Sequence, residues 1–363
     1  MKVAIVCDWL TGIGGAERVV LALHQMYPDA PIYTSQYDSS KIDWFKDADV
    51  RTLWLQKLPK NLKKFLPALR AIAFSRLNLS EYDLVISSSG AEAKGVKTSR
   101  KTIHICYMHS PTHYYWIRQK EYIENPGFPL GLNWLAKLGF RLLEKPLKSW
   151  DKLAAKRPDY IITNSNYSRD NIKKIYKRDS TVIFPPVDTE RFSGTEKESR
   201  HGLVIAGRQT PYKRFDLAIK ASNELKIPLV VIGNGPEHKK LEKLADKNVM
   251  FLTQASDSVV RDQFKSALGF IFPNKDDFGI VAVEALSAGT PVVALKEGGA
   301  LDYIKEGVNG VFFDNQNKES LKTAIEKLLT TKFNYSKISD SASDFDINNF
   351  KIKIKNFIGK VSK

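Results

Sequence analysis

Two cations that could bind a phosphate group lie in one short segment of the C-terminal half. Arg208 and Lys213 follow directly after the apolar residues 202–206. Two basic side chains in a single loop can neutralise a diphosphate that departs as an anion. Arg214 lies between them and a predicted helix, where it either faces solvent or pairs with Asp216. Each of these basic residues could also be an ordinary solvated surface side chain.

A second segment combines carboxylates with the start of a predicted helix. It runs from the apolar residues 268–272 through Asp276 and Asp277 to Gly279. The first amides of a helix have no partner within it and bind phosphate well. Glu284 lies about one and a half turns into this helix, on an otherwise apolar segment. A buried carboxylate is costly unless it has partners, and the diol of a ribose is a suitable one.

The N-terminal half carries two weaker candidates. Gly14 and Gly15 lie between the apolar residues 3–7 and a predicted helix. Glycines there let the backbone approach a phosphate, although the same turn also serves plain packing, and the full dinucleotide fingerprint is absent. His109 follows the apolar residues 103–107, at the edge where open α/β sheets bind ligands. It can donate to a substrate hydroxyl or a leaving oxygen, or be satisfied by its own loop.

The elements that must position these side chains are short strands alternating with helices. Runs of four to six apolar residues without alternation are typical of strands buried on both faces. Segments with helical periodicity lie between them. The repeated order predicts an α/β protein with two doubly wound, Rossmann-like units. The expected strands are residues 3–7, 84–87, 103–107, 160–163, 202–206, 229–232, 249–252, 268–272 and 291–294, and the expected helices 17–26, 216–225, 236–245, 257–266 and 280–288.

A polar stretch at residues 187–200 lacks apolar periodicity and predicts a boundary between two domains. We expect an N-terminal domain at residues 1–190 and a C-terminal domain at residues 200–340. Residues 341–363 retain the apolar pattern of a final helix, which we expect to pack back on the N-terminal domain.

The composition favours an anionic partner. The 363 residues include 56 Lys and Arg against 40 Asp and Glu, a net charge of +16. Such a charge suits nucleic acid, acidic lipid or phosphorylated small molecules. Two basic amphipathic stretches, residues 51–80 and 137–157, carry much of it. The two cysteines lie in apolar segments and fit a reducing cytosol. No window is long and apolar enough to span a bilayer, so we expect a cytoplasmic protein bound peripherally at the inner leaflet.

In this order, the four segments resemble a family 4 retaining glycosyltransferase of the GT-B architecture, from about residue 3 to residue 303. The best-matching subgroup comprises bacterial mannosyltransferases that use GDP-mannose in surface polysaccharide synthesis. The resemblance implies two Rossmann-like domains facing across a cleft, the N-terminal one binding acceptor and the C-terminal one the nucleotide sugar. It also implies a role for every candidate residue. The implied catalytic residues are His109, Arg208, Lys213, Asp276 and Glu284, and the implied donor-binding residues are Gly14, Gly15, Arg208, Lys213, Asp276, Asp277, Phe278, Gly279, Ile280, Val281 and Glu284.

One position departs from the family pattern. Asp276 stands where the family carries a glutamate. Its side chain is one methylene shorter, and this bears on which donor sugar is bound. The neighbouring Asp277 could take part of that role.

The resulting hypothesis is transfer of a hexose, with mannose favoured, to a lipid-linked saccharide acceptor with retention at the anomeric carbon. The expected donor is GDP-mannose, with a UDP-sugar as the alternative, and no metal or other cofactor is expected. An anionic membrane surface is the expected macromolecular partner. A GT-B epimerase or phosphorylase-type enzyme would share the scaffold. A nucleic-acid-binding module is disfavoured, because no helix-turn-helix, zinc or RNA-binding signature accompanies the charge.

Overall fold

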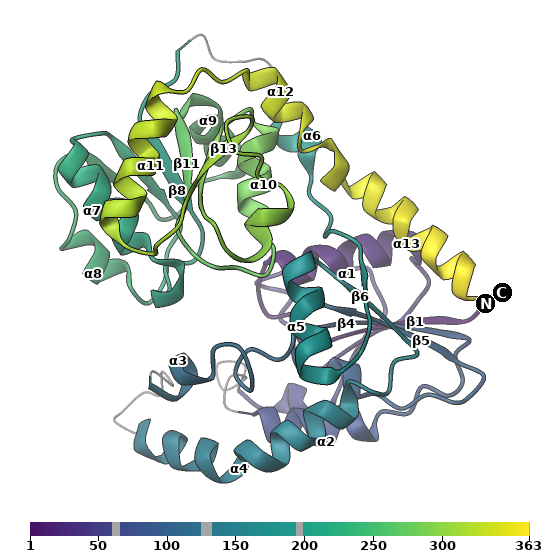
Figure 1. Ribbon diagram of the computed structural model, residues 1–363. Coiled ribbons are helices and arrows are strands. Elements are labelled where there is room, and N and C mark those ends of the chain that lie inside the picture. Colours follow the sequence, from purple (N-terminus) through teal and green to yellow (C-terminus); the bar gives the residue numbers. More distant parts are fainter. Residues whose placement is uncertain (60–65, 125–132, 194–198, 363) are drawn as a thin grey trace. The chain divides into compact units, whose positions relative to one another are not determined.

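The computed structural model describes residues 1–59, 66–124, 133–193 and 199–362, and it divides into two compact units (Figure 1). Unit 1 comprises Met1–Pro185 and Phe350–Lys363, and unit 2 comprises Pro186–Asn349. Residues 194–198, inside the expected linker, and residues 60–65, inside the first basic stretch, lie outside the described residues. The chain therefore passes from one unit to the other twice.

In the described part of unit 1, seven strands form one parallel sheet. Their order is β3-β2-β1-β4-β5-β6-β7. The order reverses between β1 and β4, so the loops after these two strands diverge and leave a crevice at the carboxyl edge. The strands are β1 (Val3–Cys7), β2 (Ile32–Thr34), β3 (Val50–Thr52), β4 (Leu84–Ser89), β5 (Ile103–Met108), β6 (Tyr160–Thr163) and β7 (Thr181–Val182).

Both faces of the unit 1 sheet are covered, which explains the largely apolar residues of its central strands β1, β4 and β5. Neighbouring side chains of a strand point to opposite faces. Cys106 and Met108 of β5 pack in one cluster with Ile172, whereas the Tyr107 ring contacts Phe350 with 5.8 Å between ring centroids. The helices of this part of the chain are α1 (Gly15–Met26), α2 (Pro67–Arg76), α3 (Gln119–Glu124), α4 (Asn133–Ala154), α5 (Asn166–Tyr176) and α13 (Ile347–Val361), and α13 carries Phe350.

Unit 2 repeats the same winding. Its described residues form a six-stranded parallel sheet in the order β10-β9-β8-β11-β12-β13, the arrangement of a Rossmann fold. The reversal lies between β8 and β11, where Gly269 and Phe270 pair with Leu203 and Val204. The strands are β8 (Leu203–Ala206), β9 (Leu229–Ile232), β10 (Val249–Leu252), β11 (Gly269–Phe272), β12 (Val292–Leu295) and β13 (Gly310–Phe313).

The unit 2 sheet is also packed on two sides. Ile271 of β11 belongs to a cluster with Phe215 and Ile325, whereas Phe270 meets the ring of Phe264 at 5.4 Å. The first contact covers one face with α7 and α11, and the second covers the other face with α9. The helices are α6 (Thr189–Phe192), α7 (Phe215–Leu225), α8 (His238–Glu242), α9 (Asp257–Ser266), α10 (Ile280–Ser287), α11 (Lys318–Thr330) and α12 (Tyr335–Asp340).

The predicted α/β class with two doubly wound, Rossmann-like units is confirmed. All nine expected strands are present within one or two residues, and the shorter strands β2, β3, β7 and β13 were not predicted. The helix expected at residues 236–245 is only five residues long. Among the described helices, none has the length and apolar character needed to cross a bilayer.

Candidate active site

Two of the predicted residues meet at the β8/β11 reversal of unit 2. Lys213 ends a short 3-10 turn (Pro211–Lys213) after β8, and Asp276 follows β11. The Lys213 ammonium forms an ion pair with the Asp276 carboxylate, and these side chains are only 15% and 20% exposed. The ammonium also lies over the Phe272 ring, 5.9 Å from its centroid. The topology thus brings together a cation and a carboxylate that are 63 positions apart.

The beginning of α10 follows in the same loop. Gly279 precedes the helix with φ +92°, and a Cβ there would lie 2.4 Å from the Phe272 ring and 2.9 Å from the Tyr303 hydroxyl. Only glycine therefore fits this turn. Among the described residues, no side chain caps the helix at Gly279. Ile280 and Val281 are partly exposed, and the first amides of a helix have no partner within the helix, so this terminus has the chemistry to accept a phosphate.

Glu284 lies one turn beyond Ile280 on the same face of α10. The residue is 6% exposed, although it is a carboxylate in an otherwise apolar helix. Side chains of a helix lean toward its N-terminus. The Glu284 side chain therefore leans toward the start of α10.

A second backbone segment supports the Asp276 loop from behind. The Gly299 amide donates to the Asp276 carbonyl at 2.9 Å. Gly298 has φ +74°, and a Cβ on it would lie 2.5 Å from the same carbonyl. The Tyr303 hydroxyl donates to the Phe278 carbonyl at 2.9 Å, and burial raises the Tyr303 pKa well above its usual range. These three residues fix the loop, and sequence reasoning missed all of them. The adjacent glycines after β12 were the available signal.

Arg208 lies in the loop after β8, next to Gly207, and its side chain is exposed. The following residue, Gln209, is fully buried and holds this loop against the one after β9. Its side-chain amide donates to the Gly233 carbonyl at 2.7 Å. A Cβ on Gly235 would lie 2.4 Å from the Gln209 carbonyl. The pair Gly233 and Gly235, also missed from the sequence, allows this close approach.

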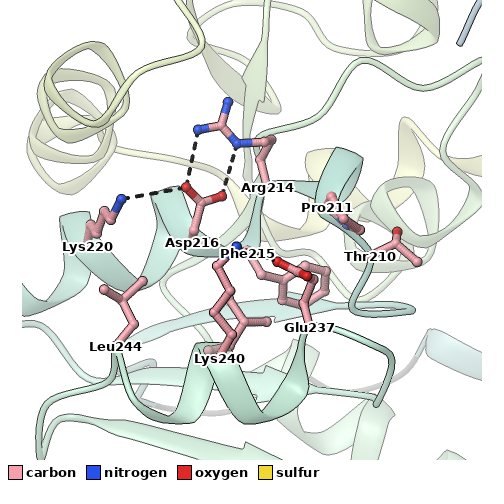
Figure 2. Close-up of a pocket in the computed structure, with 10 residues that line it drawn as sticks. Thr210, Pro211, Arg214, Phe215, Asp216, Lys220, Glu237, Lys240 and Leu244 are labelled. Atoms are coloured by element: carbon pink, nitrogen blue, oxygen red, sulfur yellow. Dashed lines mark hydrogen bonds and ion pairs between the residues drawn. The ribbon is translucent and has the colours of Figure 1, made fainter. Parts of the chain in front are cut away.

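Arg214 does not join Lys213. It forms a bidentate pair with Asp216, at 3.0 and 3.2 Å, which confirms the second of its two sequence interpretations. Both line a pocket of about 360 Å³, shown in Figure 2. Its lysines are also paired, Lys220 with Asp216 and Lys240 with Glu237. Arg208, Lys213, Asp276 and Glu284 are not among the ten lining residues, which are Thr210, Pro211, Arg214, Phe215, Asp216, Lys220, Glu237, Lys240, Leu241 and Leu244.

In unit 1, His109 lies at the carboxyl edge of the sheet, as expected from its position after β5. Its Nε2 atom lies 2.8 Å from the Ser88 hydroxyl. The Ser168 hydroxyl donates to its carbonyl at 3.0 Å, and the Tyr107 ring stands edge-on at 5.2 Å. The imidazole is half-buried. Ser88 of β4 holds its ring, and Ser168 of α5 holds its backbone, so both are fixed at this edge of the sheet.

Gly14 and Gly15 lie at the start of α1. Gly14 is extended, with φ −163°, so its backbone does not require glycine. A Cβ at Gly14 would meet only the flexible end of the Glu17 side chain, at 2.9 Å. Gly15 is exposed, and within the described chain no side chain caps α1 at Gly14. Open space rather than backbone strain is therefore what these glycines contribute.

Asp8, the first residue after β1, was not proposed as a site residue. Its carboxylate accepts hydrogen bonds from the amides of Gly90, Ala91 and Ala93 at 2.8, 3.0 and 2.7 Å. Burial raises the Asp8 pKa, and the bond from Ala93 and the charge of Lys94 oppose that rise. Asp8 thereby ties the loop after β4 to the loop after β1, at the reversal of the unit 1 sheet.

Two buried ion pairs follow that loop. Arg70 Nε lies 2.7 Å from Glu92 Oε2, and Lys94 Nζ lies 2.7 Å from Asp151 Oδ1. All four side chains are at most 3% exposed. Burial raises the Glu92 pKa, while Arg70 opposes the rise. Arg70, one of the basic residues of the amphipathic stretch 51–80, is therefore neutralised inside the unit and adds no charge to its surface.

Sequence comparison identifies both halves of the chain. The model of glycosyltransferase family 4 matches residues 13–191, and the model of the glycosyl transferases group 1 matches residues 186–345. Together they account for residues 13–345. By these two matches the chain belongs to the glycosyltransferases of the family 4 type.

Individual relatives match part of this glycosyltransferase. A D-inositol 3-phosphate glycosyltransferase of Mycobacterium leprae is 29% identical over 212 residues, which cover 51% of this chain and 50% of the relative. An uncharacterized glycosyltransferase of Methanocaldococcus jannaschii is 27% identical over 199 residues, or 53% of this chain and 56% of the relative. The match thus spans about half the length of these curated relatives.

Solved structures match the glycosyltransferase over nearly its whole length. HepE of Anabaena, solved in complex with UDP, has a TM-score of 0.71 at 18% identity and covers 99% of this chain and 100% of its own. Sucrose-phosphate synthase of Thermosynechococcus elongatus has a TM-score of 0.74 at 14% identity, covering 99% of both chains. At these identities the likeness establishes the shared GT-B fold.

Proposed function

We propose that this glycosyltransferase moves a hexose, with mannose favoured, from a nucleoside-diphosphate sugar to a lipid-linked saccharide in surface polysaccharide or glycan assembly. The observation that carries the proposal is the group of residues at the β8/β11 reversal. Asp276, which pairs with Lys213 of the turn after β8, lies in the loop that leads into the start of α10. Crevices at such reversals are where open α/β sheets bind ligands. A diphosphate matches the cations and amides, and hydroxyl groups match the carboxylates.

The proposed reaction breaks the bond between the anomeric carbon and the diphosphate oxygen, and forms a bond from that carbon to the acceptor oxygen. The electron pair leaves with the nucleoside diphosphate, and the acceptor proton passes to the leaving phosphate. Stabilisation of the departing anion is then the main catalytic demand. Arg208, Lys213 and the amides of residues 278–281 would supply it, without a metal ion.

Lys213 can serve this reaction while it remains paired. An ammonium has three donors, so it can keep Asp276 and still donate to a phosphate oxygen. Asp276, with Asp277 beside it, would accept bonds from the hydroxyls of the transferred sugar. Glu284 would hold the ribose hydroxyls. His109 of unit 1 would contact the sugar and orient it, and Gly14 and Gly15 would leave room for the donor phosphates.

The identity of the donor base is tested first, by nucleotide binding. The resemblance to mannosyltransferases favours GDP-mannose, and the complexes of HepE with UDP and UDP-glucose make UDP-sugars the second arm of the panel. We expect one of GDP, UDP or ADP, with its sugars, to raise the melting temperature. A ligand at 100 times its Kd adds about 2.7 kcal/mol of stability. Stabilisation by none of them would contradict the proposed donor site.

A matched pair of variants locates that binding. Lys213→Met removes the proposed phosphate ligand, whereas Lys220→Met removes a lysine of the same unit that is likewise paired with an aspartate. Only Lys213→Met is expected to abolish the stabilisation. Equal responses would place the nucleotide elsewhere.

Transfer is then assayed with the best donor and a polyprenyl diphosphate-linked sugar, and the product anomer is read by NMR. Retention and full activity in EDTA are expected. Inversion, or loss of activity restored by a divalent cation, would refute those parts of the proposal.

A further inference from the structure

Helix α4 has an outer face with apolar residues in line. At 3.6 residues per turn, Leu142, Pro146, Ser149 and Leu153 fall along one side of the helix. Leu142 is 69% exposed and Leu153 is 61% exposed. Leucines so exposed on the same side of one helix, three turns apart, form a surface that is costly to leave in water. In Figure 1, α4 is the long helix at the bottom of the view.

Basic residues flank this apolar line on one side. Arg141, Lys145 and Lys152 project from the same flank by helical geometry, and all three are exposed. The Lys152 ammonium also lies 5.1 Å from the centroid of the Trp116 ring. Lys156, just beyond the end of the helix, is also exposed. The outer face of α4, defined here as these four residues with Leu142 and Leu153, therefore combines apolar and cationic groups.

The acidic residues of α4 do not neutralise this face. Its sequence contains two acids, Glu144 and Asp151. Glu144 is half-buried and pairs with Lys148 at 2.7 Å. Asp151 is fully buried on the opposite side of the helix and pairs with Lys94. The charge presented to the outside is consequently positive.

The inner face of α4 fixes the helix to the part of unit 1 that carries His109. Asp151 accepts hydrogen bonds from Thr112 at 2.8 Å, Trp116 at 2.7 Å and Tyr176 at 2.6 Å. Thr112 and Trp116 belong to the loop that follows His109 directly. The outer face is thus held in a fixed position relative to the histidine that we propose to contact the sugar.

We infer that the outer face of α4 is the surface through which this glycosyltransferase binds an anionic lipid bilayer. A helix with leucines on one line and lysines beside it lies in the membrane interface, with the leucines below the headgroups and the cations on their phosphates. This inference deepens the proposed function. It rests on that function in one respect, namely that a lipid-linked acceptor would be reached at this surface. Charge complementarity selects the bilayer over a second copy of this chain, whose surface has the same net positive charge.

The test uses the full-length protein and vesicles, without donor or acceptor. Cosedimentation is measured with phosphatidylglycerol–phosphatidylcholine vesicles and with pure phosphatidylcholine vesicles, at low and high salt. We expect binding only to the anionic vesicles, weakened by salt because exposed charges are screened beyond about 10 Å at 0.1 M. Circular dichroism confirms that each variant is folded.

Two variants probe the two components of the outer face. Arg141→Glu/Lys145→Glu should reduce the partition coefficient by at least about 25-fold, because each basic residue near an acidic membrane contributes about fivefold. Leu142→Gln/Leu153→Gln should reduce it by about tenfold or more. The control is Lys239→Glu/Lys243→Glu, which makes the same change in net charge on exposed residues of unit 2. It should bind nearly as well as the original protein.

The outcomes separate this inference from the proposed function. Equal loss in the α4 and control charge variants would show that net charge alone binds the vesicles, and would overturn the inference. Binding to phosphatidylcholine alone, self-association through α4 or no binding at low salt would do the same. A protein that binds vesicles through α4 but transfers no sugar would refute only the proposed function. One that transfers sugar to a soluble acceptor without binding vesicles would refute only this surface.

Discussion

Replacement of Gly298 by alanine tests the donor site without touching any charged group. Gly298 and Gly307 have nearly identical φ angles, +74° and +73°, both in the left-handed region. A Cβ on Gly298 would lie 2.5 Å from the Asp276 carbonyl oxygen, whereas a Cβ on Gly307 would meet no described heavy atom within 4 Å. The two alanine variants thus share the same conformational strain, and only the first one displaces the loop that carries Asp276.

The size of the effect follows from this geometry. Ordinary contact with a Cβ begins at 3.4 Å, so the Gly298 segment and the Asp276 loop must separate by about 0.9 Å. A misplacement of about 1 Å in an active site costs about 100-fold in rate. The left-handed conformation costs about 1–2 kcal/mol for alanine at either position. We therefore expect Gly298→Ala to lower kcat/KM about 100-fold, and Gly307→Ala to lower it less than about threefold.

The assay is donor-dependent transfer at saturating acceptor, together with urea denaturation of both variants. Similar losses of stability with a large difference in kcat/KM would support the assignment of the Asp276 loop to the donor. If Gly298→Ala and Gly307→Ala have the same kcat/KM, the position of Asp276 does not matter for the reaction, and the reasoning that places the donor at the β8/β11 reversal is wrong.

Two further predictions concern buried ionisable groups of unit 1. Burial, assisted by the charge of Arg157, lowers the pKa of His104 from 6.5 to about 3. Below pH 6.5 the unfolded chain therefore binds more protons than the folded chain, and the free energy of unfolding decreases as the pH is lowered. At pH 5 the loss of folding free energy is about 2 kcal/mol. His104→Gln should remove this loss when the urea midpoints at pH 7 and pH 5 are compared. If the difference between the two midpoints is the same in His104→Gln as in the original protein, the prediction is wrong. Asp151→Asn leaves the buried ammonium of Lys94 without its carboxylate and should lower the free energy of unfolding by about 3–5 kcal/mol in guanidinium denaturation. Adding Lys94→Met should make this loss smaller. If the losses of the two single variants simply add in the double variant, the two residues do not act as a pair.

The candidate site could be predicted from the sequence wherever it lies at the end of a buried strand. Strands β8 and β11 are short runs of uniformly apolar residues, and each is followed by a glycine or a proline and then by polar residues. Parallel strands place all such ends at one edge of the sheet. Arg208, Lys213 and Asp276 were accessible to this reasoning for that reason. The short strands β2 and β7 were not, since two or three residues give no periodicity to detect.

What could not be predicted is which charges pair and which are buried. The Lys213–Asp276 contact depends on strand order, which a periodic pattern does not contain. Arg70 has the sequence context of a solvated residue on an amphipathic helix, yet it lies inside unit 1 because Glu92, 22 positions later, neutralises it. Helical periodicity treats every charge as exposed. Helical periodicity therefore predicts the wrong exposure for both residues of a buried ion pair.

The repeated fold leaves open why the donor should prefer unit 2, and the first residue after each leading strand supplies a reason. In unit 1 this residue is Asp8, whose carboxylate occupies the amides of the loop after β4. In unit 2 the corresponding residue is Gly207, which has no side chain, and the start of α10 has no side-chain cap within the described chain. An anion approaching the crevice of unit 1 would meet the Asp8 carboxylate, which already accepts hydrogen bonds from the amides of the loop after β4. In unit 2 an anion would meet the start of α10, where the N-cap residue Gly279 offers no side chain, beside the Lys213–Asp276 pair. This difference supports the proposed placement of the diphosphate in the second unit.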